Sequence, residues 1–363
     1  MKRRLIHISS TIFICGLLLM GCTKDGRIIY IPDPEEEQPP TTPLVMVVYG
    51  PNGLGDRSYC DLIYNGVEAA ARRLGLRTLQ LSPETEELGM VYLETMFHQM
   101  ETASDSVRRL FITPSPVYEE FIRENNKRLE RNPNADLLFM ETTTPLEGKG
   151  STFYIDYYGA MYMGGCMVHY SAKDLVSVLL ANPYTQSVLE AAEGFQDGFN
   201  DTPQFNEKQP VLLHTRYLSD EIGGGFSLED STALRILNEE LELVGSTSDI
   251  TFVPICGGSM HPLMRAIRSK IWMSYLYIGI DGDMNVDSRY CSFSIIKRVD
   301  EITADCISKW LNGTLPKHQN FGLADGATAV LMDNVPFYMK AANLNLDSLK
   351  QVAIRKEGER YEK

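Results

Sequence analysis

Apolar and polar positions follow two different periods at the start of the folded chain. Residues 44–49 form a nearly unbroken apolar run, which is typical of a parallel strand covered on both faces. Over residues 59–74 the apolar positions recur at helical spacing and form one stripe. Residues 50–55 are rich in glycine and interrupt both patterns. The stretch therefore predicts a strand, a glycine-rich turn and a helix.

The same alternation of strands and helices continues along the chain. Further strands are predicted at residues 77–81, 110–113, 135–140, 153–155, 174–181, 211–218, 250–256, 277–280 and 292–296. Helices are predicted between them at residues 90–102, 117–129, 157–165, 188–199 and 228–243, with another after residue 297. This rhythm indicates an α/β protein with doubly wound sheets. About three hundred residues exceed what one hydrophobic core usually serves, so two Rossmann-like lobes are expected.

The first residues have the features of a lipoprotein signal peptide, predicted over residues 1–21. Basic residues at positions 2–4 precede an apolar run over residues 12–20, which is too short to span a bilayer. The run ends in Leu19-Met20-Gly21-Cys22, which resembles a bacterial lipobox. Cleavage before Cys22 would leave a chain lipid-anchored to a bacterial membrane, at the periplasmic face or the cell surface of the envelope. The alternative is a signal peptide with an incidental cysteine.

Residues 22–43 are predicted to form a disordered tether. They include Glu35-Glu36-Glu37 and Pro39-Pro40 and little that could pack into a core. Like charges extend such a segment, and proline stiffens it. The segment is therefore interpreted as a spacer between the anchor and the folded lobes, with an interaction tail as the alternative.

Charge and the scatter of cysteine and histidine exclude several classes of partner and site. The formal net charge of −14 argues against nucleic acid as a partner, but not against a neutral ligand. The cysteines after Cys22 include no C-x-x-C pair, and the histidines form no H-E-x-x-H or H-x-H motif. We therefore expect no metal site and no cofactor.

Several motifs lie at the ends of predicted strands, in a fixed order along the chain. They occupy residues 56–66, 194–199, 256–258, 277–283, 292–300 and 321–326. Together they resemble the basic membrane protein family of lipoproteins, of the purine nucleoside receptor type, from residue 44 to about residue 330. The resemblance implies a type I periplasmic binding protein fold with a hinge of several crossings. It also implies a substrate-binding protein of an ABC transporter, which is not an enzyme.

The chain path of that family implies how the lobes divide the sequence. The N-terminal lobe would comprise residues 44–170 and 294–318, and the C-terminal lobe residues 171–293 and 319–345. The helix after residue 297 would complete the first lobe. Residues 346–363 are expected to be a C-terminal tail.

Candidate ligand-binding residues follow from the same motifs, because ligands of open α/β sheets bind at the carboxyl ends of strands. The resemblance implies that Tyr59 and Phe226 hold a purine between their rings, where a flat base gains burial and stacking. Ordinary core positions are the alternative for both, although the three glycines before Phe226 favour a mobile loop tip. Asp56 is also expected in the site, and both Asp56 and Ser58 stand where the first helical N–H groups need acceptors.

The remaining candidates would bind the sugar. By the resemblance, Asp281 binds the ribose, since a carboxylate accepts two hydrogen bonds side by side from a diol. Asp283 could bind the ribose instead of Asp281. The alternative role for Asp281 is to accept hydrogen bonds from N–H groups of its loop. Lys297 would donate to a ribose oxygen or be solvated at a helix start. Gly258 would let its backbone approach the sugar or would simply form a turn.

Two positions depart from the family pattern. Gly50 stands where the family has an acidic residue, and Cys60 stands where it has an asparagine. Both changes remove polar contacts to a ligand. The leading interpretation is a lipid-anchored receptor that captures a purine nucleoside or a similar small molecule for an ABC permease. The alternatives are a surface lipoprotein of the same fold with another ligand, and an enzyme acting on nucleosides, for which no nucleophile elbow or cofactor fingerprint is present.

Overall fold

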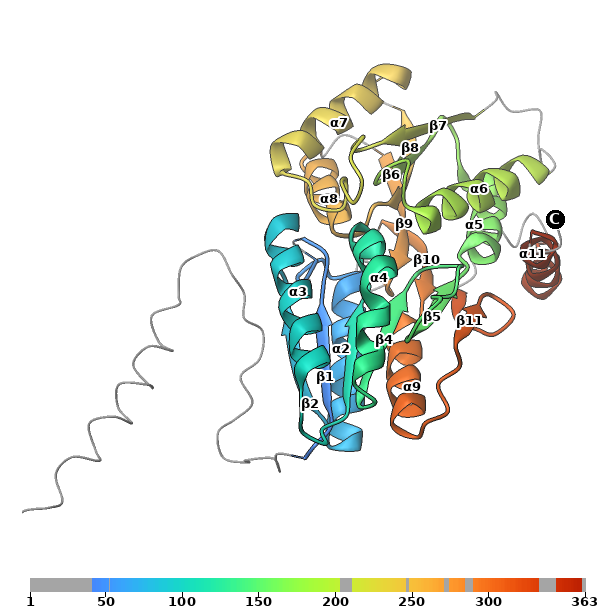
Figure 1. Ribbon diagram of the computed structural model, residues 1–363. Coiled ribbons are helices and arrows are strands. Elements are labelled where there is room, and N and C mark those ends of the chain that lie inside the picture. Colours follow the sequence, from blue (N-terminus) through green and yellow to red (C-terminus); the bar gives the residue numbers. More distant parts are fainter. Residues whose placement is uncertain are drawn as a thin grey trace, which may run out of the picture.

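The computed structural model describes residues 41–51, 53–202, 211–245, 248–270, 274–284, 290–332 and 344–360. The predicted signal peptide, the predicted lipidation site Cys22 and residues 22–40 of the predicted tether lie outside these ranges. The described residues form two α/β lobes, each built on one six-stranded sheet (Figure 1). The expected two-lobed α/β architecture is confirmed.

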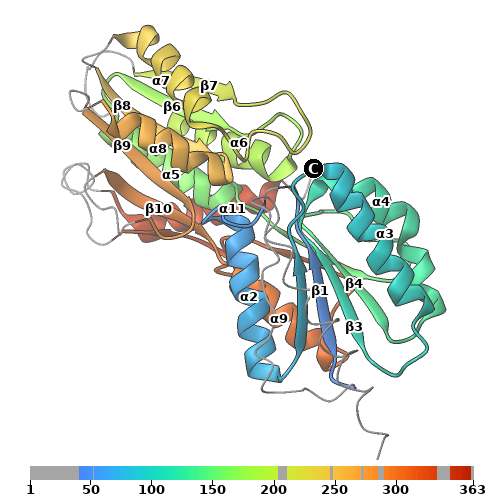
Figure 2. The same ribbon diagram turned by 90° about the vertical axis from the view of Figure 1, so that its left-hand side faces the viewer.

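The first lobe has an all-parallel sheet in the strand order β11-β5-β4-β3-β1-β2. Its strands are β1 (Leu44–Val48), β2 (Arg77–Leu81), β3 (Arg109–Thr113), β4 (Ala135–Met140), β5 (Ser151–Ile155) and β11 (His318–Phe321). Helices α2 (Tyr59–Leu74) and α9 (Val299–Leu311) cover one face, and α3 (Glu86–Thr102) and α4 (Glu119–Asn125) cover the other (Figure 2). The 3-10 turns η1 (Pro116–Tyr118) and η2 (Asn126–Arg131) flank α4, so the single helix predicted over 117–129 is divided.

Strand β1 illustrates how the apolar pattern builds this lobe. Val45 and Val47 pack with residues of α2 and α9, whereas Met46 and Val48 pack with residues of α3 on the opposite face. All four side chains are buried. This double coverage is what the unbroken apolar run predicts. It fixes the glycine-rich turn that follows at the carboxyl edge of the sheet.

The second lobe has the strand order β12-β10-β9-β8-β6-β7, with β12 antiparallel to β10. Its strands are β6 (Leu175–Leu180), β7 (Leu212–Tyr217), β8 (Asp249–Ile255), β9 (Ser274–Asp281), β10 (Cys291–Lys297) and β12 (Thr328–Leu331). Its helical segments are α5 (Tyr158–Ser171), α6 (Gln186–Asp201), α7 (Asp230–Val244), η3 (Gly257–Ser259), α8 (Met260–Arg268) and α11 (Leu346–Glu359). Helices again cover both faces of the sheet (Figure 2).

The chain crosses between the lobes after β5, after β10, and between β11 and β12. This path corrects the expected lobe boundaries, because β10 and α5 belong to the second lobe and β11 belongs to the first. For β10 the reason is its apolar segment, residues 293–296, which pairs with β9 and lies largely in the core of the second lobe. The chain therefore crosses next to Arg298, and α9 packs on α2 in the first lobe.

The C-terminal residues form a helix where a tail was expected. Helix α11 packs beside α5, and its residue Ala353 is fully buried (Figure 1). Near its end, the carboxylate of Glu357 accepts hydrogen bonds from the backbone N–H groups of Gly159 and Leu323, each at 2.8 Å. Gly159 follows the first crossing and Leu323 lies in the third. The helix therefore connects two segments of the hinge.

Helix α5 packs closely against α6. A Cβ atom on Gly165 would lie 2.0 Å from the carbonyl oxygen of Phe195 in α6, so a larger residue would separate the two helices. Gly164 faces the side chain of Ile295 in β10, so α5 also packs against a strand of the sheet. The contact with α6 is an addition that the sequence did not reveal.

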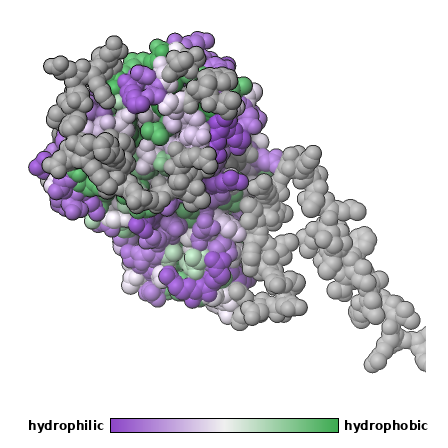
Figure 3. All heavy atoms as spheres, turned by 180° about the vertical axis from the view of Figure 1, so that it is seen from behind, coloured by the Kyte–Doolittle hydropathy of each residue, from purple (hydrophilic) through white to green (hydrophobic). Residues whose placement is uncertain are grey.

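The described surface is mixed in polarity. On the face seen in Figure 3, polar residues cover much of the described surface, and apolar residues form small groups. Within the ranges given above, no helix combines the length and the apolar character that crossing a membrane requires.

We predict that Glu357→Ala lowers the free energy of unfolding by about 1–3 kcal/mol, because two buried N–H groups lose their acceptor. Burial raises the pKa of Glu357 from 4.5 to about 7, with Asp156 adding to the shift. The folded state thus holds the proton more tightly than the unfolded state, and the stabilisation is full below pH 4.5 and declines as the pH rises through about 7. The deficit of the variant, measured by urea unfolding, should shrink over the same range.

The neighbouring Gly358→Ala is the control for that measurement. Gly358 is exposed on α11, and a Cβ atom there meets nothing within 4 Å. It should be neutral or stabilising by up to about 1 kcal/mol. Equal stability of wild type and Glu357→Ala at low pH would contradict the bridging role of Glu357.

Candidate functional site

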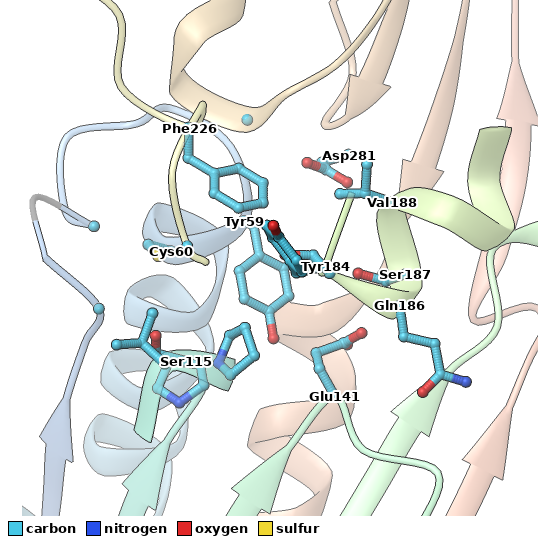
Figure 4. A pocket seen from close by; sticks show the side chains of 18 of the residues that line it. Tyr59, Cys60, Ser115, Glu141, Tyr184, Gln186, Ser187, Val188, Phe226 and Asp281 are labelled. Carbon is cyan, nitrogen blue, oxygen red and sulfur yellow. The ribbon is translucent and has the colours of Figure 1, made fainter. Parts of the chain in front are cut away.

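A cavity of about 320 Å³ lies between the two lobes. Loops at the carboxyl ends of β1, β3 and β4 line it from the first lobe, and loops after β6, β7 and β8 line it from the second. Side chains from both lobes point into one space (Figure 4). Five of the six predicted ligand-binding residues line it: Asp56, Tyr59, Phe226, Asp281 and Lys297. Because these residues lie at or after the carboxyl ends of strands, the fold brings them to one place, as expected of open α/β sheets.

The carboxylate of Asp56 is occupied by the start of α2. Its Oδ1 accepts from the backbone N–H groups of Ser58 and Asp61 at 2.8 and 3.1 Å, and its Oδ2 accepts from that of Cys60 at 2.9 Å. Burial raises the pKa of Asp56 to about 6, although these hydrogen bonds oppose the shift. Asp56 thus caps the helix and also lines the cavity, so the direct ligand contact expected of it stays a prediction.

Ser58 makes no capping hydrogen bond with its side chain and bonds to the other lobe instead. Its hydroxyl donates to Oδ2 of Asp281 at 2.7 Å, from the first lobe to the second. Asp281 has a left-handed φ of 66°, and its N–H donates to the Tyr157 hydroxyl at 2.9 Å. Burial raises the pKa of the Asp281 carboxyl, whereas Ser58 and Lys297 oppose the shift. Asp281 therefore both faces the cavity and links the closed lobes.

Two further contacts hold the lobes together. His261 of α8 donates from Nε2 to the carbonyl oxygen of Asp56 at 3.0 Å. A Cβ atom on Gly258 would lie 3.0 Å from the carbonyl oxygen of Phe226 and 3.1 Å from Cβ of Asp56. Among the described residues, Gly257 lines the cavity and Gly258 does not. The expected contact of Gly258 with a sugar is therefore corrected, because this glycine instead lets the turn of the other lobe approach.

Lys297 is buried, and its ammonium group is paired with a carboxylate of the other lobe. Its Nζ donates to Oε2 of Glu141 at 2.6 Å, and the two side chains are 3% and 8% exposed. The same Nζ lies 5.5 Å from the ring centroids of Tyr59 and Tyr157, within the range of cation–π attraction. Burial raises the pKa of Glu141, and Lys297 opposes that shift. A solvated lysine, one of the two alternatives for this position, is excluded.

Sequence reasoning missed Glu141. Glu141 directly follows β4, and Asp281 is likewise the last residue of β9. A search for polar residues at the ends of predicted strands could therefore have found Glu141. Its φ of 60° is uncommon for a residue with a side chain. Its Oε1 is buried without a hydrogen-bond partner, and so is the hydroxyl of Tyr59. A buried polar atom without a hydrogen bond lowers the stability of the fold, and a ligand that bonds to these two atoms would remove that penalty.

Aromatic rings face the cavity from both lobes. Tyr59 belongs to the first lobe, and Phe226 and Tyr184 belong to the second (Figure 4). Tyr184, which sequence reasoning missed, is 55% exposed and precedes α6. Its loop is fixed by Asn182, whose side-chain oxygen accepts from the Tyr184 N–H at 3.0 Å. The available signal was an aromatic residue at the end of the strand predicted over 174–181.

The loop that carries Phe226 is anchored at two points. The side chain of Asn182 donates to the carbonyl oxygen of Gly224 at 2.8 Å, and the hydroxyl of Ser259 donates to that of Gly225 at 2.7 Å. The ring of Phe226 is half-buried in the wall of the cavity. The mobility expected of its loop stays a prediction.

The two positions that depart from the family pattern also line the cavity. A Cβ atom on Gly50 would lie 2.8 Å from Oγ of Ser115, so Ser115 fills the space beside it. Cys60 is the second position, and burial raises the pKa of its thiol. Asp283, the alternative to Asp281, is exposed and is not among the described residues that line the cavity.

Comparison with known proteins identifies the fold. No protein-family model matches the chain, and no curated protein sequence matches it. An ABC transporter solute-binding protein from Aeropyrum pernix K1 is 14% identical with a TM-score of 0.68, over 87% of this chain and 86% of that one. A glucose-galactose binding protein from Geobacillus stearothermophilus is 13% identical with a TM-score of 0.57, over 82% and 99%.

A third similar structure has a different role. A transcriptional activator of the comK gene from Bacillus halodurans is 16% identical with a TM-score of 0.60, over 87% of this chain and 96% of that one. Identities this low show the fold alone, which is that of the type I periplasmic binding proteins, as the resemblance implies. The narrower resemblance to purine nucleoside receptors stays a prediction.

We predict that Asp56→Ala lowers the free energy of unfolding by about 0.5–2 kcal/mol through loss of the helix cap. Asp56→Asn should cost less, because its amide oxygen can keep the hydrogen bonds that Oδ1 makes with Ser58 and Asp61. Urea unfolding of the three proteins measures the difference. An equal loss for Asn and Ala would show that α2 needs the charge of Asp56 and not the capping hydrogen bonds.

Proposed function

We propose that the protein is a lipid-anchored solute-binding protein that captures a purine nucleoside, or a similar small molecule, for an ABC importer. The observation that carries the proposal is a cavity to which each lobe contributes an aromatic ring and a carboxylate. Tyr59 and Glu141 belong to the first lobe, and Phe226 and Asp281 belong to the second. A solute that contacts both sets stabilises the closed lobes, which is how a two-lobed receptor traps its ligand by hinge motion.

A nucleoside suits these walls in two parts. Its flat base gains apolar burial and stacking against the rings of Phe226, Tyr59 and Tyr184. Its ribose diol can donate to a carboxylate such as Asp281. A hexose could use the same groups, and one structure of similar fold is a glucose-galactose binding protein. Sugars are therefore the second class of candidate ligand.

The charges around the cavity favour a neutral ligand. Among the described residues, Asp56, Glu119, Glu141 and Asp281 line it together with one cation, Lys297. Lys297 is already paired with Glu141. A phosphate group would meet the remaining carboxylates at short range, where like charges repel strongly.

The cavity favours binding over catalysis. The described residues that line it include no histidine, and burial raises the pKa of the two lining thiols, Cys60 and Cys256. A raised pKa leaves little of the thiolate that nucleophilic catalysis needs. Within the described ranges, no three His, Cys, Asp or Glu side chains are grouped so that they could hold a metal ion.

Calorimetry with nucleosides, their free bases, their monophosphates and simple sugars tests the ligand class. We predict that nucleosides bind more tightly than the free bases and the monophosphates. Phe226→Ala should weaken nucleoside binding by about 1–3 kcal/mol, the usual value of one base stacked on a ring. Asp281→Ala should cost at least as much for nucleosides and little for free bases, which have no diol.

Tyr217→Ala is the control, because this ring is 41% exposed on β7 and is not among the described residues of the cavity wall. It should leave binding unchanged. Preference for a monophosphate would contradict the proposal. Binding of sugars but not nucleosides would favour a sugar receptor, and binding of none of these compounds would favour a surface lipoprotein with another ligand.

The lipid anchor is tested separately. We predict that metabolic labelling with palmitate tags the wild-type protein and does not tag Cys22→Ser, since the lipid would be attached to the Cys22 thiol and amine. A label that survives the substitution would contradict the lipid anchor at Cys22. It would leave the proposal about the ligand unaffected.

A further inference from the structure

Glu141 is a buried charged residue of the cavity wall, and one oxygen of its carboxylate has no hydrogen-bond partner. Oε2 accepts from Lys297 at 2.6 Å. The side chain is only 8% exposed, and Oε1 is buried and has no hydrogen-bond partner. A buried, unmade hydrogen bond to a charged group is among the more expensive defects a fold can carry. The group lines the cavity, so a bound solute is in a position to complete it.

The backbone supports this orientation of Glu141 at a cost. Its left-handed φ of 60° is a strained conformation for a residue with a Cβ atom. The following residue fixes the chain, since the Thr142 N–H donates to the Phe153 carbonyl oxygen at 3.2 Å and Arg123 donates to the Thr142 hydroxyl at 2.9 Å. With the backbone held in this way, the carboxylate lies on the side of Tyr59 in the cavity (Figure 4), and its Oε2 contacts Lys297.

The groups beside Oε1 define what a ligand must offer. The ammonium of Lys297 has three N–H donors and gives one to Glu141. The Tyr59 hydroxyl, which can donate or accept, is buried without a partner. Asp281 is close enough to Glu141 for its charge to contribute to raising the Glu141 pKa. Two carboxylates, one ammonium and one phenol thus offer both acceptors and donors, and sugar hydroxyls, each of which donates and accepts, match such a set.

We propose that Glu141 is a specificity-determining residue that accepts a hydrogen bond from a hydroxyl group of the bound solute. Lys297 holds its carboxylate in place and donates to the same hydroxylated end of the ligand. The inference rests on the proposed function of the cavity as a solute site. It narrows the ligand to molecules that carry at least one hydroxyl at this end, such as the ribose of a nucleoside.

The test compares guanosine with 2′-deoxyguanosine, 3′-deoxyguanosine and guanine on wild type and Glu141→Gln, by calorimetry. Wild type should lose about tenfold to a hundredfold in affinity when the hydroxyl read by Glu141 is absent, the value of a hydrogen bond to a charged group. Glu141→Gln should bind guanosine about that much more weakly. It should discriminate little between guanosine and that deoxy analogue. The collapse of this ratio is the expected signature.

Two further variants separate specificity from folding. Glu141→Asp keeps a carboxylate for Lys297 but shortens its reach, so it should fold and also lose the discrimination. Glu147→Gln is the matched control from the same loop, because its side chain is 90% exposed, and it should leave both affinity and discrimination unchanged.

The outcomes distinguish this inference from the proposed function. If both Glu141 variants bind guanosine, its deoxy analogues and guanine with the same fractional loss, Glu141 acts on the base or on the fold and not on a hydroxyl group, and the inference is overturned. If wild type binds none of the four compounds, the failure appears before any substitution, and the proposed function falls together with the inference.

Discussion

The ion pair between Lys297 and Glu141 joins the end of β10 in one lobe to the end of β4 in the other, inside the protein. Removing two charges from water costs several kcal/mol per ion, and a buried pair often repays this incompletely. Here the cation is further placed beside the rings of Tyr59 and Tyr157. A pair that stabilises so little by itself is better explained by what it presents to the cavity. It holds a carboxylate and an ammonium where a solute must contact both lobes.

Residues that join the two lobes lie at the proposed solute site. Ser58 of the first lobe donates to Asp281 of the second, and His261 donates to the backbone of Asp56. Both links can form only when the lobes are together. Helix α11 packs in the second lobe, and its Glu357 bonds to two segments of the hinge. The hinge is therefore connected to the core of the second lobe. A ligand that makes the missing hydrogen bonds of the closed form shifts the equilibrium between open and closed lobes toward the closed form. The size of the shift is set by how much more tightly the ligand binds the closed form than the open form.

The sequence predicted most of the fold because apolar periodicity is a local property. The ranges 59–74, 77–81 and 135–140 agree with α2, β2 and β4. The helix expected over 90–102 begins earlier, at Glu86, because Thr85 caps it. Partners distant in sequence were not predictable in the same way. Helix α11 is helical because it packs on α5, and Ser58 pairs with Asp281, 223 positions away, in place of capping its own helix. Glu141 directly follows a predicted strand, so its place at the site was predictable, but only the folded chain shows that its Oε1 has no partner.

The most direct test of the account is native mass spectrometry of the purified protein, with identification of any small molecule that it releases on denaturation. Both lobes would retain a solute that completes the hydrogen bonds of Glu141 and Tyr59. The account predicts release of a neutral compound that contains a ring and hydroxyl groups. Release of a phosphorylated compound, or of one without hydroxyl groups, would contradict it.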